Sequence, residues 1–193
     1  MDLMQEAEVV ERILKGEQEL FAEMVRAHQS LVFTTCMGFT HSREDAEDLT
    51  QEVFISAYQQ LGRFKGDSKI STWLYRIAVN ASLNHMRNSK RRSIFQRIEG
   101  LFVKDKAEVQ PPVMPLGDNP EQLLISAQES EAVQQAIDSL PESQRVAFTL
   151  SRYDELPQSE IAAIMSISEG AVEQLLQRAK ANLRKKLVAF YKK

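Results

Sequence analysis

The fold of this chain is decided by one run of sequence, Phe64-Lys65-Gly66-Asp67-Ser68-Lys69-Ile70-Ser71-Thr72-Trp73-Leu74-Tyr75-Arg76. Its first half combines glycine with an aromatic residue and cations, a composition typical of a loop. Its second half starts a helical pattern near Ser71, where apolar residues recur at spacings of three and four: Trp73, Leu74, Ile77, Ala78 and Ala81. The same spacing leaves Arg76, Asn80, Asn84 and Arg87 on other faces. The run predicts a basic loop that leads into an amphipathic helix.

Upstream of this run, the sequence predicts a helix with an acidic face. Residues 42–45 resemble a capping box, and apolar residues then recur at helical spacing: Leu49, Val53, Phe54, Ala57, Tyr58 and Leu61. Glu44, Asp48 and Glu52 follow one another at four-residue spacing. This acidic stripe is either a solvated surface or a docking surface for a basic helix, and the residues alone leave both open. No segment shows a convincing period of two, so the chain is predicted to be all-α.

The C-terminal segment predicts a helix-turn-helix. Residues 157–165 fit a short helix, residues 166–168 a tight turn, and residues from Glu169 to about Phe190 a long helix. Apolar residues form one stripe of the long helix: Val172, Leu175, Leu176, Ala179, Leu183 and Leu187. A polar face lies opposite: Gly170, Glu173, Gln174, Gln177 and Arg178. That face is either a solvated surface or a reader of base edges, because Gln and Arg can pair with adenine and guanine in the major groove.

A proline-rich stretch divides the chain. Pro111, Pro112, Pro115 and Pro120 fall in ten residues without apolar periodicity, so we expect a flexible linker at 93–119, between helical domains at 1–92 and 120–193. Those 27 residues would span on the order of 30 Å as a coil and roughly 90 Å when extended. Asn119-Pro120-Glu121 is a suitable start for the first helix of the second domain.

Charge is segregated along the chain, although its formal net value is only -3. Residues 1–60 carry 4 Lys and Arg against 12 Asp and Glu, and residues 61–106 carry 11 against 3. Residues 107–155 carry 2 against 9, and residues 156–193 carry 7 against 3. A phosphate backbone responds to local clusters of cations, so a nucleic-acid partner is compatible with the acidic total.

Several classes of protein are disfavoured by what the sequence lacks. Cys36 is the only cysteine, so no disulfide is possible within the chain and a reducing compartment is expected. No apolar run is long enough to span a bilayer, and residues 1–6 do not resemble a signal peptide, so we expect a cytoplasmic protein without membrane insertion. The three histidines lack metal-ligand spacing, so no metal, cofactor or catalytic site is expected.

These motifs together carry a family resemblance. Residues 45–54, Phe64-Lys65-Gly66, residues 71–80, Leu140-Pro141 with Gln144-Arg145, and the terminal helix-turn-helix resemble a bacterial RNA polymerase sigma factor of the extracytoplasmic-function (ECF) group, within the sigma-70 family. The resemblance covers nearly the whole chain outside the linker. It implies a two-domain helical protein, with a sigma region 2 domain and a winged-helix-like sigma region 4 domain. Such a protein binds polymerase core and directs it to promoters, without catalysis of its own.

The resemblance also assigns roles to residues. Binding to the clamp helices of core polymerase falls to Asp48, Leu49, Gln51, Glu52 and Phe54. Recognition and opening of the minus-10 element falls to Arg63, Phe64, Lys65, Gly66, Asp67, Ser68, Lys69, Arg76, Asn80 and Arg87. Binding to the minus-35 duplex falls to Ser168, Glu169, Gly170, Glu173, Gln174, Gln177, Arg178, Lys180 and Arg184. Expected partners are core polymerase, through its clamp helices and flap, promoter DNA and an anti-sigma factor.

Two other classes stay open at this point. A repressor or activator that binds operator duplex alone would explain the helix-turn-helix, but would leave residues 62–80 and the acidic helix unexplained. A small helical enzyme would leave both halves unexplained. The chain also departs from many sigma factors at Glu173 and Gln177, where a basic or aromatic residue is frequent, so its upstream promoter sequence does not follow from relatives.

Overall fold

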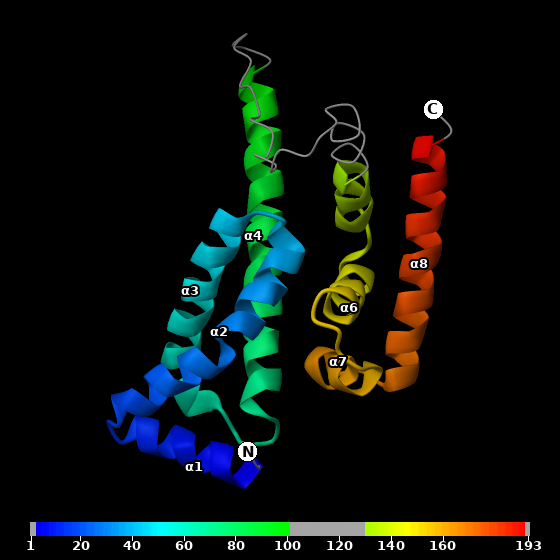
Figure 1. The fold of residues 1–193 in the computed structure, drawn as a ribbon. Coiled ribbons are helices and arrows are strands. Elements are labelled where there is room, and N and C mark those ends of the chain that lie inside the picture. Colours follow the sequence, from blue (N-terminus) through cyan, green and yellow to red (C-terminus); the bar gives the residue numbers. More distant parts are fainter. Residues whose placement is uncertain (1–2, 101–129, 192–193) are drawn as a thin grey trace, which may run out of the picture.

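The computed structural model describes residues 3–100 and 130–191, and it is helical throughout these ranges (Figure 1). The N-terminal domain contains α1 (Leu3–Leu14), α2 (Gln18–Thr40), α3 (Arg43–Gln60), a short 3-10 helix η1 (Leu61–Arg63) and α4 (Ile70–Gly100). The C-terminal domain contains a helical segment at 130–138, then α6 (Glu142–Arg152), α7 (Gln158–Met165) and α8 (Glu169–Tyr191). No strand occurs in the described ranges, so the prediction of an all-α, two-domain chain is confirmed.

The start of α3 follows the capping pattern in the sequence. Ser42 is the N-cap residue, and its hydroxyl accepts a hydrogen bond from the Asp45 backbone N–H at 3.3 Å. Glu44 and Asp45 lie in the first turn, where negative charge is favourable toward the helix dipole. One residue earlier, His41 adopts a left-handed conformation (φ 54°) that ends α2. The two-residue connection places α2 and α3 side by side along α4 (Figure 1).

The core of the N-terminal domain uses the stripe predicted for α4. Leu74 and Ala78 are buried against Val32 of α2 and Val53 of α3, while Trp73, Ile77 and Ala81 are half-buried around the same cluster. Burial of these apolar side chains holds the three long helices together. The predicted amphipathic helix is therefore confirmed, with its first residue at Ile70.

Helix α4 extends further than the sequence division suggested. It continues to Gly100, so residues 93–100 are helical, although the sequence predicts that the linker begins at residue 93. No proline or glycine lies between Ile70 and Gly100, and the proline cluster begins eleven residues after Gly100. The rest of the expected linker, and the helix start expected at Asn119-Pro120, lie outside the described residues.

The C-terminal domain contains the predicted helix-turn-helix. Ser166, with a left-handed φ of 56°, ends α7 and donates its backbone N–H to carbonyls of the preceding turn. Its conformation reverses the chain within three residues before α8 begins at Glu169. Ile161 of α7, Val172 and Leu176 of α8 and Leu150 of α6 are buried together. This packing fixes the angle between the two helices of the motif.

A second apolar stripe on α4 joins the two domains. Tyr75, Val79, Leu83 and Met86 recur at spacings of three and four and are buried in the same cluster as Val146, Ile161 and Ile164 of the C-terminal domain. Phe39 of α2 belongs to this cluster as well. Helix α4 is thus apolar on two faces, and Figure 1 shows the C-terminal domain lying along the second of them.

Candidate functional site

The acidic face of α3 is open to solvent. Asp48, Gln51 and Glu52, three of the five residues expected to bind polymerase, are exposed. The other two, Leu49 and Phe54, are only 3% and 8% exposed and pack in the domain core, so they position the helix from inside. Ile55 lies one turn beyond Gln51 and is 59% exposed. The sequence analysis did not select Ile55, although its spacing from Asp48 and Glu52 places it on their face.

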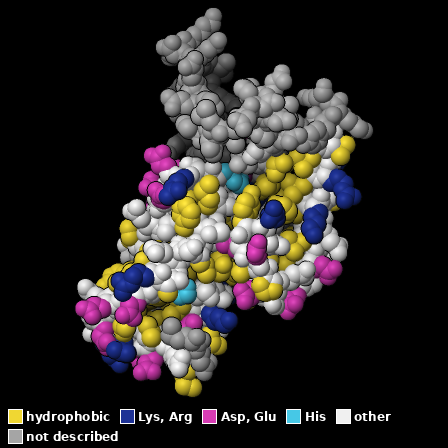
Figure 2. All heavy atoms as spheres, in the orientation of Figure 1, with side chains coloured by type: hydrophobic (Ala, Val, Ile, Leu, Met, Phe, Trp, Pro, Cys, Tyr) yellow, Lys and Arg dark blue, Asp and Glu magenta, His cyan; other side chains and the backbone are white. Residues whose placement is uncertain are grey.

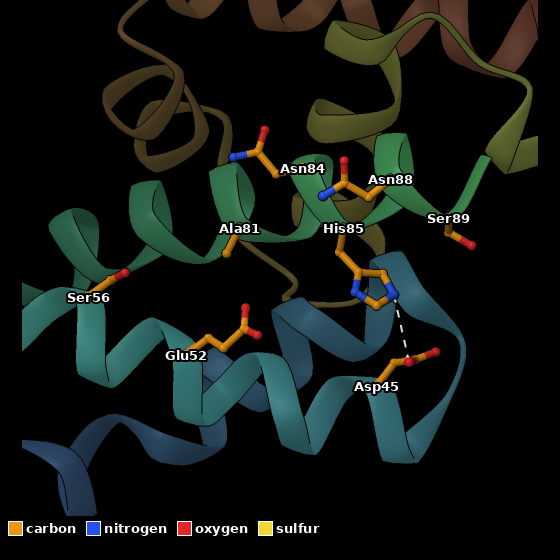
Figure 3. Close-up of a pocket in the computed structure, with 8 residues that line it drawn as sticks. All are labelled: Asp45, Glu52, Ser56, Ala81, Asn84, His85, Asn88 and Ser89. Atoms are coloured by element: carbon orange, nitrogen blue, oxygen red, sulfur yellow. Dashed lines mark ion pairs between the residues drawn. The ribbon is translucent and has the colours of Figure 1, made fainter. Parts of the chain in front are cut away.

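A polar hollow lies between the acidic helix and α4. Its volume is about 440 Å³, and Figure 3 shows its lining, which comes from α3 (Asp45, Glu52, Ser56) and α4 (Ala81, Asn84, His85, Asn88, Ser89). His85 Nε2 lies 3.7 Å from Asp45 Oδ1, and the two form an ion pair when the histidine is protonated. The hollow therefore lies beside the acidic face of α3, with Glu52 on one wall and residues 81–89 of α4 on the other.

The loop that precedes α4 is a cluster of exposed cations held on a rigid base. Arg63, Lys65 and Lys69 are all exposed, as is Asp67, and Ser68 is half-buried. Gly66 adopts a φ of +75°, which favours glycine, and a Cβ there would lie 3.3 Å from Cβ of Ala7 in α1. The loop therefore turns sharply against α1 while its basic side chains project outward.

Glu6 anchors the far end of this loop. Its side chain is 9% exposed and accepts a hydrogen bond from the backbone N–H of Ile70, the first residue of α4. A carboxylate at this position satisfies a free N–H and complements the helix dipole. The sequence analysis missed Glu6, because it lies 64 residues from Ile70 and no local pattern links them.

Phe64 packs within the loop instead of projecting fully from it. Its ring centroid lies 5.5 Å from that of Trp73 at an interplanar angle of 62°, and its side chain is half-buried beside the domain core. Edge-to-face aromatic pairs of this kind are favourable. Phe64 therefore fixes the loop to α4 and keeps part of its ring accessible.

The remaining minus-10 candidates lie on α4, at the boundary with the C-terminal domain. Arg76 donates from Nη2 to the Ala163 carbonyl at 2.7 Å and from Nε to the Ile164 carbonyl at 3.3 Å. Arg87 donates from Nη2 to the carboxylate of Glu142 at 2.7 and 2.8 Å. Asn80 is exposed and lines a hollow of about 250 Å³ between the domains. The structure thus separates these three residues from the loop cluster.

Helix α8 presents a continuous polar surface. All nine residues expected to contact the minus-35 duplex are exposed: Ser168, Glu169, Gly170, Glu173, Gln174, Gln177, Arg178, Lys180 and Arg184. Ser168 caps the helix, since its hydroxyl accepts the Ala171 N–H at 3.3 Å. Gln177 donates from Nε2 to Glu173 Oε1 at 3.2 Å. In Figure 2, Lys and Arg side chains lie along the edge of the molecule where α8 runs.

Two features of the described residues bear on other functions. No group of three or more His, Cys, Asp and Glu side chains is placed to hold a metal ion there. Within the same ranges, no helix is both long and apolar enough to cross a membrane.

Comparison with known protein families matches both domains. Residues 24–92 match Sigma-70 region 2, and residues 130–183 match Sigma-70, region 4. The ECF RNA polymerase sigma-E factor of Escherichia coli K12 is 36% identical over 179 residues, which cover 93% of this chain and 92% of the relative. The chain belongs to the ECF sigma factor family. This membership favours promoter-specific initiation of transcription over the repressor and enzyme alternatives.

Further relatives of this sigma factor agree with the assignment. The RNA polymerase sigma-H factor of Pseudomonas aeruginosa is 34% identical over 185 residues, which cover 95% of this chain and 94% of the relative. Among solved structures, CnrH in complex with the cytosolic domain of CnrY gives a TM-score of 0.62 at 21% identity, covering 95% of this chain and 97% of that one. RpoE of Bartonella quintana, solved with the anti-sigma factor NepR, gives a TM-score of 0.56 at 22% identity, covering 86% of this chain and 96% of that one. Because both identities are low, these two structures support the assignment of the fold alone.

Proposed function

We propose that this sigma factor uses three separate surfaces to start transcription. The acidic face of α3 binds the clamp helices of core polymerase, the loop at 63–69 with one face of α4 recognises the minus-10 element, and the polar face of α8 reads the minus-35 duplex. The observation that carries this proposal is that all nine minus-35 candidates are exposed along one side of a helix-turn-helix.

The α3 surface fits a basic partner helix with an apolar contact at its centre. Asp48 and Glu52 supply the negative charge and Ile55 the apolar side chain, all on one exposed face. Complementary charges guide such an encounter and fix its register, whereas buried apolar area supplies affinity. Leu49 and Phe54 contribute indirectly, by holding α3 against the core.

The loop surface fits single-stranded DNA. A base taken out of the helical stack needs an aromatic or apolar wall, and its phosphates need nearby cations. The half-buried Phe64 supplies the wall, and Arg63, Lys65 and Lys69 supply exposed positive charge around it. The hydrogen bond from Ile70 to Glu6 keeps the loop in place, which lowers the entropic cost of binding.

The α8 surface fits duplex DNA. Gln174, Gln177 and Arg178 supply donors and acceptors that match adenine and guanine edges in the major groove. Lys180 and Arg184 lie about one and two turns beyond Gln177 on the same exposed side and suit phosphates. The early turns of α8 therefore read bases while its later turns follow the backbone.

Regulation and location follow from the same role. We propose that an anti-sigma factor binds this chain, since the sigma factor RpoE, which has a similar fold, was solved with the anti-sigma factor NepR. The C-terminal domain also contacts the polymerase flap, and the chain acts in the cytoplasm. It requires no cofactor or metal, because the chemistry belongs to the polymerase.

A reconstitution separates this proposal from duplex binding alone. Core polymerase, the purified chain and promoter fragments selected from the native host are combined, and strand opening is followed with permanganate. We expect unpaired thymines at the minus-10 element only when both core and the chain are present. Opening by core alone, or occupancy of both elements by the chain without core, would contradict the proposal.

A further inference from the structure

The two domains meet at an interface that uses residues expected to bind DNA. On the N-terminal side lie Phe39 of α2 and the stripe Tyr75, Val79, Leu83 and Met86 of α4. On the C-terminal side lie α6 and α7, with Val146 and Ile164 at the contact. Polar contacts surround this apolar seam, including those made by Arg76 and Arg87.

We propose that this closed arrangement is a self-inhibited state, in which the C-terminal domain occupies the minus-10 residues Arg76 and Arg87 of α4 and leaves the loop at 63–69 and the α3 and α8 surfaces free. The inference rests on the proposed function for the identity of the covered surface. The covering partner is the chain's own α7 with the start of α6. Promoter opening then requires the domains to separate.

Arg76 is the clearest case of one residue with two exclusive uses. Its guanidinium donates to the carbonyls of Ala163 and Ile164 in the last turn of α7. Carbonyls at a helix C-terminus lack intrahelical partners and carry partial negative charge, so a cation there is favourable. While Arg76 caps α7, the same donors cannot contact a phosphate or a base.

The seam also repels nucleic acid electrostatically. The hollow beside Asn80 is lined by Glu142, whose carboxylate neutralises Arg87 at 2.7 Å. A phosphate that approached Arg87 would have to displace this carboxylate or face like-charge repulsion. The closed state therefore removes two cations from the minus-10 surface and adds an acidic residue to it.

The other two surfaces stay accessible in the closed state. Asp48, Gln51 and Glu52 of α3, and Gln174, Gln177 and Arg178 of α8, are all exposed. The closed chain can thus dock on core polymerase or meet an upstream duplex before it opens. Inhibition acts on the step that needs the minus-10 surface.

The interface offers a position for a reversible lock. A Cβ built on Gly38 of α2 would lie 2.8 Å from Cγ2 of Thr149 in α6. Since Cγ2 is about one bond length, roughly 1.5 Å, from Thr149 Cβ, the two Cβ atoms would lie at most about 4.3 Å apart, below the upper limit of about 4.5 Å for a disulfide. Gly38→Cys with Thr149→Cys, in a Cys36→Ser background, supplies the pair. The single-cysteine chains serve as matched controls.

The test compares the oxidised and reduced forms of the full chain with core polymerase. We expect the pair to oxidise readily. The oxidised chain should lose promoter opening and bind single-stranded minus-10 oligonucleotide more weakly, but keep core association and minus-35 duplex binding. Reduction should restore what was lost, and the single-cysteine chains should not respond. A pair that stays reduced under oxidant, or an oxidised chain that opens promoters as well as the reduced one, would overturn the inference.

A wedge at the same position tests the inference in the opposite direction. Gly38→Ala in a chain that keeps Thr149 places a methyl group 2.8 Å from Thr149 Cγ2 and 3.2 Å from the ring of Tyr153, so the closed packing must yield. The cysteine pair relieves the closer of these contacts, because cysteine has one γ atom where threonine has two. Alanine favours the interior of α2, so the N-terminal domain keeps its fold. We expect a larger radius of gyration and tighter binding to the single-stranded oligonucleotide. If the reduced cysteine pair or the Gly38→Ala chain failed to open promoters with core polymerase, the result would count against the proposed function. If Gly38→Ala left the radius of gyration unchanged, the result would count against the closed state.

Discussion

The hydroxyl of Thr35 on α2 and the carboxylate Oδ1 of Asp154, between α6 and α7, form a hydrogen bond of 2.9 Å across the domain interface. Thr35 Oγ1 also lies 3.0 Å from the carbonyl oxygen of Leu31, and one hydroxyl proton cannot serve both acceptors fully. A protonated Asp154 would resolve this, because it could donate to Thr35 while Thr35 donates to Leu31. Burial raises the pKa of Asp154 to about 6, against the opposing effect of the Thr35 hydrogen bond.

This pair predicts that closure depends on pH. The closed chain holds the Asp154 proton more tightly than an open chain with the ordinary pKa of 3.8. Closure is therefore fully favoured below that value and weakens as pH rises through about 6. Cys36 on α2 and Tyr75 on α4 face Asp154, and burial raises the pKa of each, so both stay neutral across this pH range. The negative charge of Asp154 raises both pKa values further, and the charge of Glu160 also raises the pKa of Tyr75. The radius of gyration should increase as pH rises.

Asp154→Asn isolates the contribution of this residue. Asparagine keeps an acceptor for Thr35 without a charge, so the variant should be more compact than wild type at neutral pH. Its radius should vary less between mildly acidic and neutral solution. His41 and Asp138 also lie at this interface, 3.8 Å apart, and form an ion pair only when His41 is protonated. Identical profiles for variant and wild type would exclude Asp154 as a titrating contact.

Reversal of charge on α3 should abolish core binding. Asp48→Lys with Glu52→Lys turns two attractive contacts into repulsive ones toward a basic partner helix. Both side chains are exposed, so stability should change by only about 0.5 kcal/mol. Glu19→Lys with Glu23→Lys, at the same spacing on the exposed side of α2, is the matched control. Gel filtration with core measures association, and equal binding by both double variants would rule out the α3 surface.

Substitutions on α8 should separate base readout from phosphate contact. Gln174→Ala or Gln177→Ala should relax preference at one upstream base pair, at about 1–3 kcal/mol for a lost bidentate contact. If Arg178 contacts phosphate, Arg178→Ala should weaken binding to all DNA sequences alike. The slope of log Kobs against log salt concentration should then become shallower by about 0.9. Binding-site selection and salt titration measure these effects. If none of the three variants shifts the selected upstream consensus or the affinity for duplex DNA, the polar face of α8 is a solvated surface that does not read DNA.

Phe64 should matter for strand opening more than for transcription from an opened template. Phe64→Ala loses a stacking contact worth on the order of 1–3 kcal/mol, so open complexes on closed duplex should decrease. On a template already mismatched at the minus-10 element, the unpairing cost is absent and the defect should shrink. Phe64→Leu keeps apolar volume beside Trp73 and serves as the control for packing. If Phe64→Ala gave the same permanganate footprint as wild type on closed duplex, Phe64 would have a packing role and no role in strand opening.

Much of the fold follows from short-range patterns. Ser42 with Asp45, the α4 stripe around Leu74, and the turn at Ser166 are each specified by residues within a few positions of one another. Local propensity and apolar period therefore predict these elements correctly. The exposure of the α8 face follows in the same way, because the residues opposite a buried stripe face solvent.

The contacts between distant segments could not be predicted from such patterns. Glu6 lies 64 residues from Ile70, and Thr35 lies 119 residues from Asp154. The stripe Tyr75, Val79, Leu83 and Met86 was visible in the sequence, but one apolar stripe already explained α4 and the second had no evident partner. The role of Arg76 at the end of α7 depends on that partner.

The seam between the two domains also changes how competition for α4 depends on concentration. Because both halves of the seam belong to one chain, dilution of the protein leaves their association unaffected. Polymerase and promoter DNA, by contrast, bind more fully as their concentrations rise. The fraction of free chains with a bare minus-10 surface therefore stays constant as a cell makes more of this sigma factor, and it rises only when a partner that prefers the open chain, such as promoter DNA, becomes more abundant.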